Sequence, residues 1–250
     1  SMGFHAFLVK ERIQKVPRYS FQRPFIECYK LSPGVFDWRA GVEDSSKGLN
    51  CEDVGQKKLL PRHVKYPDFT IQAPVSIYSR GKIQTGQKPE KYWSDRAVKN
   101  ISDQLKGFPE QELSINPAKD LQEMTLANHS IVDQPYSANP AKKLLGNDFI
   151  IFDFGLNTTG FVGARIVCKE AGRLYLTFDE ILSDGDVDFK RMSCINAITY
   201  DLEPGEYDIE SFEPYTLKYL KMIMVDGESE VSNIYLRTLT NSDISRANFS

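Results

Sequence analysis

Apolar residues in the second part of the chain follow the spacing of β-strands. Phe149 to Phe154 form a nearly continuous apolar run, which is typical of a strand covered on both faces. Apolar and polar positions then alternate over 162–168 and 174–178, as in half-buried strands, and residues 169–172 are the predicted turn between them. Further strands are predicted over 195–202, 207–212, 217–225 and 231–239. This series predicts a mainly β fold, a jelly-roll or concanavalin-like antiparallel β-sandwich of two packed sheets.

Prolines mark the first 146 residues as a different region. Of the 13 prolines, all but Pro204 and Pro214 precede Gly146, and proline favours turns and sheet edges because it lacks a backbone N–H. We therefore expect a loop-rich region with short strands over 21–31 and 74–83. The polar stretch 133–147 is the predicted boundary. The predicted domains are an N-terminal proline-rich region over 1–146, a β-sandwich over 147–241 and a linker over 242–250.

Two helices are predicted within the proline-rich region. Apolar residues three and four positions apart predict a helix near 94–107, and Pro109 prevents its continuation. A second, short helix is predicted after Asn116 and Pro117, with Leu121 and Met124 on its inner face. Both helices are minor additions to a chain dominated by strands.

Composition and charge narrow the classes of protein that the chain can belong to. Hydrophobic residues at 41% and charged residues at 26% are ordinary globular values, and no apolar run is long enough to span a bilayer. A net charge of −3 provides no basic field for nucleic acid. The cysteines Cys28, Cys51, Cys168 and Cys194 are too few and too scattered for a disulfide scaffold. We expect a soluble protein that binds neither nucleic acid nor a membrane.

The stretch FDFGLNTTGFVG, residues 152–163, holds the most distinctive motif. Gly155 and Gly160 flank a polar tip between two apolar segments. This arrangement predicts a tight connection between two strands that uses the φ range of glycine. The alternative is that the polar tip lies near a sugar site.

The same stretch begins an ordered series of residues that resembles the β-sandwich preceding the catalytic barrel of bacterial α-L-rhamnosidases, a glycoside hydrolase family. The series matches a D-F-G-x-N-x-x-G signature, a following turn and an E-x-x-x-D-G pattern, and it then continues toward the C-terminus. The matching residues are Asp153, Phe154, Gly155, Asn157, Gly160, Ala171, Gly172, Glu180, Asp184, Gly185, Tyr200, Gly205, Phe212, Glu213, Pro214 and Tyr219.

The resemblance implies a non-catalytic role for this chain. In the family, two carboxylic acids of an (α/α)₆ barrel act as general acid and general base, with inversion. The barrel motif resembles R-E-x-x-G-W, which this sequence lacks, and too few residues follow Gly227 for any barrel. We assign no catalytic residue and expect the chain to be inactive alone. The implied partners are the catalytic barrel of the same polypeptide, beyond the linker over 242–250, and rhamnose-containing glycans. By the same resemblance, residues 1–146 are part of, or a linker from, an upstream β-sandwich.

The first residues, SMGFHAFLVKERIQKV, lack the basic, apolar and small-residue segments of a signal peptide. The sequence therefore assigns no compartment, and a periplasmic or secreted parent protein stays open.

Several carboxylates of the second region are candidates for an acid–base pair or a metal site. Asp179 and Glu180 are adjacent on a predicted strand and face opposite sides, so they cannot flank one bond. The aspartates of SDGDVDF alternate as in a calcium loop, but Phe189 stands where an EF-hand needs glycine and Ile195 where it needs glutamate. A solvated hairpin is favoured, and we predict neither a metal site nor a cofactor.

Trp93 and Trp38 are the candidate sugar-stacking residues, because an aromatic ring can pair with the C–H face of a pyranose. Packing in the core or between domains is the simpler explanation for both. Besides the scaffold role, two alternatives stay open: an independent carbohydrate-binding module, and a packing or interaction domain. The last predicts an exposed apolar patch near the C-terminal end.

Overall fold

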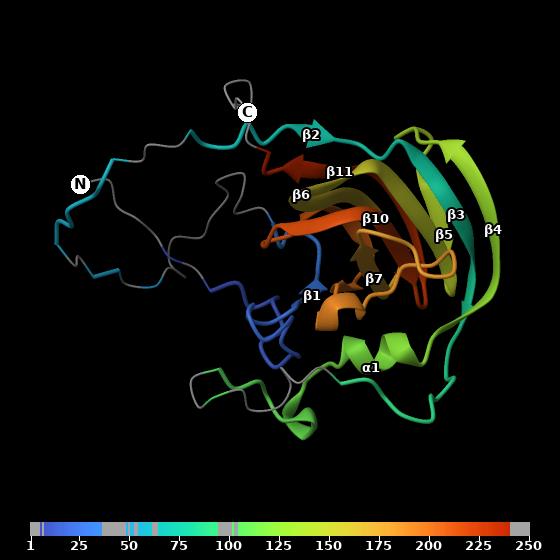
Figure 1. Ribbon diagram of the computed structural model, residues 1–250, viewed down its shortest axis with the longest axis horizontal. Helices are drawn as coiled ribbons and strands as arrows, with labels where there is room; N and C mark the ends of the chain where they lie inside the picture. Colours follow the sequence, from blue (N-terminus) through green and yellow to red (C-terminus); the bar gives the residue numbers. More distant parts are fainter. Residues whose placement is uncertain are drawn as a thin grey trace, which may run out of the picture.

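The computed structural model describes residues 6, 8–36, 49, 51–52, 55–61, 65–94, 102 and 105–240. These residues form a mainly β fold, a mixed and mostly antiparallel sheet of 11 strands with few short helices (Figure 1). The strands are β1 (Glu27–Leu31), β2 (Ile71–Gln72), β3 (Ser76–Gln84), β4 (Thr125–Pro135), β5 (Lys142–Leu145), β6 (Asp148–Glu170), β7 (Gly172–Asp179), β8 (Ala197–Leu202), β9 (Gly205–Glu210), β10 (Tyr215–Met224) and β11 (Glu228–Thr238). The predicted fold class is confirmed.

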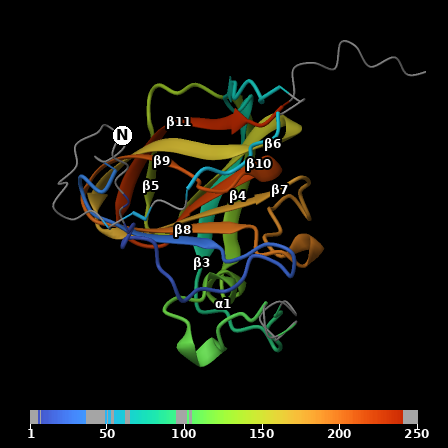
Figure 2. The ribbon, with the colours of Figure 1, turned by 90° about the vertical axis from the view of Figure 1, so that its left-hand side faces the viewer.

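Strand β6 connects two facing portions of the sheet. Its first part, up to Gly160, pairs with β10 and β3, and its second part, from Gly160 on, pairs with β11 and β9. Where the sequence predicted two separate sheets, the structure has one sheet that folds over on itself. Figure 2 shows β9 and β11 on one side and β7, β8 and β1 on the other.

The remaining strands extend the two portions. The order along the sheet is β1-β8-β7-β10-β6-β11-β2, while β4 pairs with β3 and β5 pairs with β11. Strands on both sides of residue 146 therefore pair within one sheet. The β1–β8 pair is parallel, and the other named strand pairs are antiparallel.

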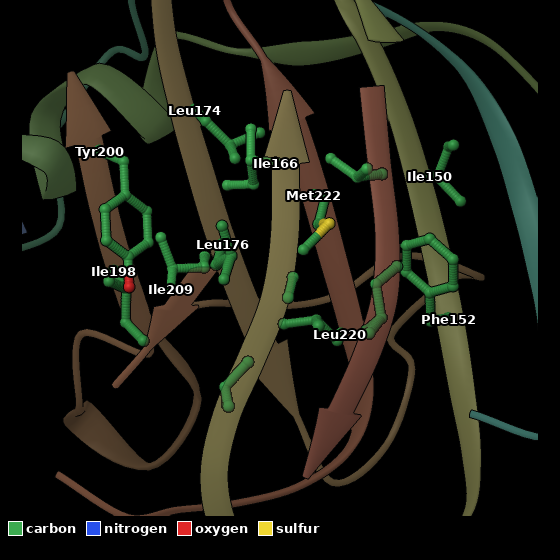
Figure 3. Packing of buried hydrophobic residues seen from close by; sticks show 14 of the residues in the cluster. Ile150, Phe152, Ile166, Leu174, Leu176, Ile198, Tyr200, Ile209, Leu220 and Met222 are labelled. Atoms are coloured by element: carbon green, nitrogen blue, oxygen red, sulfur yellow. The ribbon is translucent and has the colours of Figure 1, made fainter. Parts of the chain in front are cut away.

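An inner core fills the space between the facing portions. It contains alternate residues of β6, β7, β8 and β10, which meet residues of β9 and β11 from the other side (Figure 3). Ile166 and Ile209, for example, come from the portion opposite Leu174, Leu176 and Met222. The apolar positions predicted over 162–168 and 174–178 all belong to this inner core.

An outer core lies on the other face of β6, β7 and β10. Phe149, Ile151, Tyr175 and Ile223 alternate with inner-core residues and pack against helix α1 (Pro117–Gln122) and other segments outside the sheet. The sequence predicted β7 to be half-buried, which is wrong. Both of its faces are buried because these segments cover the second one.

Helix α1 confirms the predicted short helix. The Asn116 side chain accepts a hydrogen bond from the Lys119 N–H, Pro117 occupies the first turn, and Leu121 is buried. The predicted helix near 94–107 falls largely outside the described residues, as does the linker over 242–250. No helix among the residues described is long and apolar enough to cross a membrane.

Candidate functional site

Trp93 lies at the surface of the outer core, where Gln122 of α1 holds its backbone. The Trp93 N–H donates to Gln122 Oε1 at 2.6 Å, and the Trp93 carbonyl accepts from Gln122 Nε2 at 3.0 Å. The side chain is partly buried and lines two adjacent hollows, of about 360 Å³ and about 130 Å³. Its surroundings fit both predicted roles, packing and an accessible ring. Trp38 lies outside the described residues.

The larger hollow, called here the Trp93 groove, runs between α1 and the loop 181–190. Its polar lining comes from Lys91, Gln122, Thr177, Asp186, Asp188 and Lys221. Thr177 belongs to β7 and Lys221 to β10, so these two residues are part of the sheet beneath the groove.

Lys221 and Asp186 form an ion pair within the groove. Lys221 is only 5% exposed, and its Nζ lies 2.7 Å and 2.8 Å from the two carboxylate oxygens of Asp186. The ammonium also lies 4.5 Å from the centre of the Phe149 ring. Burial lowers the pKa of Lys221, and the attraction of Asp186 offsets this only in part. Both oxygens of Asp186 are thereby engaged by the fold itself.

The loop that carries Asp186 is attached to the end of β7 by Arg191. The guanidinium contacts the buried Asp179 carboxylate at 2.6–2.7 Å and Glu180 at 3.2 Å. The sequence placed Asp179 and Glu180 on opposite sides of one strand, which is wrong because β7 ends at Asp179. One arginine reaches both carboxylates, and their role here is to anchor the loop.

The three alternating aspartates do not converge on one point, and two of them, Asp186 and Asp188, have partners of their own. Asp184 and Gly185 have φ values of 52° and 79° in a turn between Ser183 and Asp186, which agrees with the predicted hairpin. Asp186 binds Lys221, and Asp188 accepts the Lys190 N–H at 3.1 Å. No group of three or more His, Cys, Asp or Glu among the described residues could hold a metal ion.

The signature residues on β6 shape the strand rather than a site. The Asp153 carboxylate accepts the Gly155 N–H at 2.6 Å, and Gly155 has a φ of +78°. A Cβ at Gly160 would lie 2.8 Å from the Arg237 carbonyl oxygen. The sequence predicted a tight connection between two strands here. The structure corrects this prediction, because the chain passes through a bulge opposite β10 and continues as β6.

Glu27 is a buried hub that the sequence did not reveal. It is 0% exposed and accepts four hydrogen bonds, of 2.7–2.9 Å, from the Tyr29 and Tyr215 hydroxyls and from the N–H groups of Phe212 and Glu213. Burial and the neighbouring Glu27 raise the pKa of Tyr215, which keeps its hydroxyl as a donor. The family-like segment 212–215 is thus fixed to β1. A single acidic residue in a short strand gave no signal of this role.

Three exposed apolar residues, called here the apolar cluster, lie on segments that pair near the end of β11 or near Gly155. It consists of Ile71, Val75 and Leu156, which are 62%, 57% and 71% exposed. Val75 contacts the position of Gly155, and the Val75 N–H donates to the Asp153 carbonyl at 2.7 Å. The Thr238 N–H donates to the Thr70 carbonyl at 2.8 Å, next to Ile71. The end of β11 therefore lies beside the cluster.

No family model matches this chain, and no curated protein matches it. Among solved structures, a GH78 family rhamnosidase of Bacillus sp. GL1 aligns with 50% of this chain at 16% identity and a TM-score of 0.41, over 15% of its own length. A rhamnosidase from Klebsiella oxytoca with rhamnose bound aligns with 69% of this chain at 15% identity and a TM-score of 0.38, over 29% of its own length. The chain therefore has structural similarity to part of α-L-rhamnosidases, at low identity and partial coverage, and it spans less than a third of either protein.

Proposed function

We propose that this chain is a non-catalytic β-domain of an α-L-rhamnosidase that supports the catalytic barrel of the same polypeptide. The observation that carries the proposal is the place of the family-like residues in the fold. Asp153, Gly155 and Gly160 govern the course of β6, and Phe212 and Glu213 are held by Glu27. Residues that resemble the family thus have architectural roles.

The carboxylates around the Trp93 groove support the non-catalytic part of the proposal. Inverting hydrolysis needs one carboxylic acid to protonate the leaving oxygen and a second carboxylate to activate water. Of the two aspartates that line the groove, Asp186 is engaged by Lys221 and Asp188 accepts the Lys190 N–H, while the nearby Asp179 at the end of β7 is engaged by Arg191. Such carboxylates hold the loop in place, and we do not assign them to a pair that acts on a glycosidic bond.

The apolar cluster of Ile71, Val75 and Leu156 supports the scaffold role. Where exposed apolar side chains form a contiguous patch, they mark a surface where another protein unit packs, and the proposal assigns such a patch to these three residues. This cluster lies beside the end of β11, from which the chain continues past residue 240. It is the surface that we assign to the barrel.

Two measurements test this function. The purified chain is expected to release no 4-nitrophenol from 4-nitrophenyl α-L-rhamnoside, and hydrolysis that copurifies with it would contradict the non-catalytic role. The reading frame after Ser250 is expected to encode a helical barrel. The barrel, expressed separately, should bind the chain, and Leu156→Asp should weaken that binding at least about tenfold. Asn157→Asp, an equal charge change at the next residue, is the control, and equal effects of the two substitutions would contradict the assignment.

A second candidate function is carbohydrate binding at the Trp93 groove, favoured by the position of Trp93 between two hollows. Titration of the chain with millimolar L-rhamnose should then give saturable heat that Trp93→Ala abolishes. Absence of heat with the folded wild-type chain would remove this candidate and leave the scaffold role unaffected.

A further inference from the structure

A third hollow, of about 380 Å³, opens at the margin of the inner core, on a different part of the molecule from the Trp93 groove. It is called here the Phe212 pocket, and its lining includes Arg12, Tyr29, Phe161, Tyr200, Phe212 and Arg237. These residues come from β1, β6, β8 and β11, from the segment after β9, and from the N-terminal segment. Aromatic rings form much of the wall, and Tyr29 and Tyr200 stack with ring centres 5.5 Å apart.

Among the described residues that line the Phe212 pocket, two arginines accompany one carboxylate. Arg237 is paired with Glu210, with Nε–Oε2 and Nη2–Oε1 distances of 2.9 Å and 2.7 Å, and its guanidinium lies over the Phe161 ring. Arg12 lies over the Phe212 ring, 5.3 Å from its centre. Among the residues that the structure describes, no carboxylate forms an ion pair with Arg12. Among the described residues, Arg12 is therefore a cation without a paired carboxylate, and aromatic rings lie around it.

Glu210 and Ser211, two other polar residues of the pocket, are engaged by the protein. Glu210 accepts hydrogen bonds from Tyr235 and Arg237, and Ser211 Oγ donates to the Glu213 carbonyl and accepts the Val162 N–H. A ligand with many hydroxyl groups would find few partners here. A ligand with one anionic group and an otherwise apolar ring would leave none of its own polar groups unpaired.

The wall of the pocket is also preorganised. Glu27 Oε2 accepts both the Tyr29 hydroxyl at 2.7 Å and the Phe212 N–H at 2.8 Å, so one buried carboxylate fixes the Tyr29 side chain and the backbone that carries the Phe212 ring. Ordered walls reduce the entropic cost of binding, because few side chains have to be immobilised.

From this geometry we infer that the Phe212 pocket binds a small aromatic monocarboxylate. The carboxylate pairs with the Arg12 guanidinium in a charge-assisted, bidentate contact, and the ring lies among Tyr29, Phe161 and Phe212. The pocket, of about 380 Å³, is large enough for a single six-membered ring with its acid group. This inference goes beyond the scaffold role and does not depend on it.

Calorimetric titration with benzoate tests the inference, and benzamide is the uncharged probe of the same shape. Benzoate is expected to bind at least about tenfold more tightly than benzamide. Arg12→Met should remove this preference, and Arg80→Met should leave it unchanged. Arg80 is an exposed arginine of β3 outside the pocket, so this control removes the same charge.

Three results would overturn the inference: no heat with millimolar benzoate, equal affinity for benzoate and benzamide, or equal effects of the two arginine substitutions. If Arg12→Met lowers the thermal midpoint by more than a few degrees, Arg12→Gln and Phe212→Ala provide the same comparison. When benzoate is titrated and followed by nuclear magnetic resonance, the largest chemical-shift changes should occur around Phe212 rather than around Trp93. Leu156→Asp should not change benzoate affinity, which separates this site from barrel docking.

Discussion

The inner and outer cores use alternate residues of the same strands but are closed in different ways. Inner-core residues such as Phe152 face other strands, so the sheet itself excludes water. Outer-core residues such as Ile151 and Tyr175 are covered by α1 and by loops distant in sequence. Charged groups attach these covering segments, as in the pairs Lys221–Asp186 and Arg191–Asp179.

This difference shows where charged and polar side chains are needed in a fold whose cores are otherwise apolar. A strand satisfies its backbone groups through its neighbours, whereas a covering loop needs side-chain partners for the polar groups that it buries. We therefore expect inner-core changes to act through lost packing and outer-core changes to act through unpaired charges. The following predictions test this contrast, starting from the largest effect.

Phe152→Ala should lower the free energy of unfolding by about 3–5 kcal/mol, because it leaves a cavity where a fully buried ring packs between the two portions of the sheet. Urea unfolding followed by circular dichroism measures the change. Ile131→Ala, at an exposed position of β4, should change the same quantity by less than about 0.5 kcal/mol. Similar losses for both variants would contradict the inner core as described.

Glu27→Gln should cost about 2–4 kcal/mol of unfolding free energy. The amide nitrogen cannot accept hydrogen bonds, so donors among Tyr29, Tyr215, Phe212 and Glu213 lose their acceptor while buried. The measurement is again denaturant unfolding, with Glu213→Gln as the control because that side chain is partly exposed. A loss under about 1 kcal/mol at position 27 would mean that the hub contributes little.

Lys221→Met should cost about 1–2 kcal/mol. It leaves Asp186 without its partner, but that carboxylate is partly exposed and the methionine keeps the apolar contact with Phe149. The Asp186→Asn variant, which leaves the lysine buried and unpaired, should be destabilised at least as much as Lys221→Met.

The same lysine predicts a pH dependence. Its folded-state pKa lies below the unfolded value of 10.5, so the unfolded chain binds more protons between these two values. The contribution of Lys221 to stability therefore rises with pH through this window. Wild type should gain stability relative to Lys221→Met as the pH approaches 10.5, in denaturant titrations at several pH values. A difference that is constant with pH would contradict the lowered pKa.

Trp93→Ala should have the smallest effect, about 1 kcal/mol or less, because the ring is only partly buried against the outer core. Thermal unfolding measures it, with Trp93→Phe as the matched variant that retains a ring. A loss comparable to that of Phe152→Ala would place Trp93 among the main packing residues and remove the reason for testing it as a sugar contact.

Much of the second region could be predicted from sequence because one face of each strand there meets the inner core. The alternation of Leu174, Leu176 and Phe178 is such a case. Strand β4 was missed for the opposite reason. It is an edge strand that pairs only with β3, and most of its residues on both faces are exposed, so its sequence carries no apolar period.

The sites were less predictable than the strands. Trp93 stood out by residue type, whereas Lys221, Glu27 and Arg12 acquire their roles from partners far away in sequence. The alternation of apolar and polar residues along the strands could not predict that a lysine on β10 would be buried beside an aspartate of a distant loop. Pairing of that kind is decided by tertiary packing.

The continuity of β6 has a consequence for motion. A hinge between the two portions would have to bend β6 near Gly160, where it pairs with both Tyr215 of β10 and Thr238 of β11, and would have to part the inner core that the two portions share. The portions should therefore open together, and amide protons over 150–153 and 160–167, on either side of the bulge, should exchange with solvent only through global unfolding. The described sheet would then behave as one rigid body.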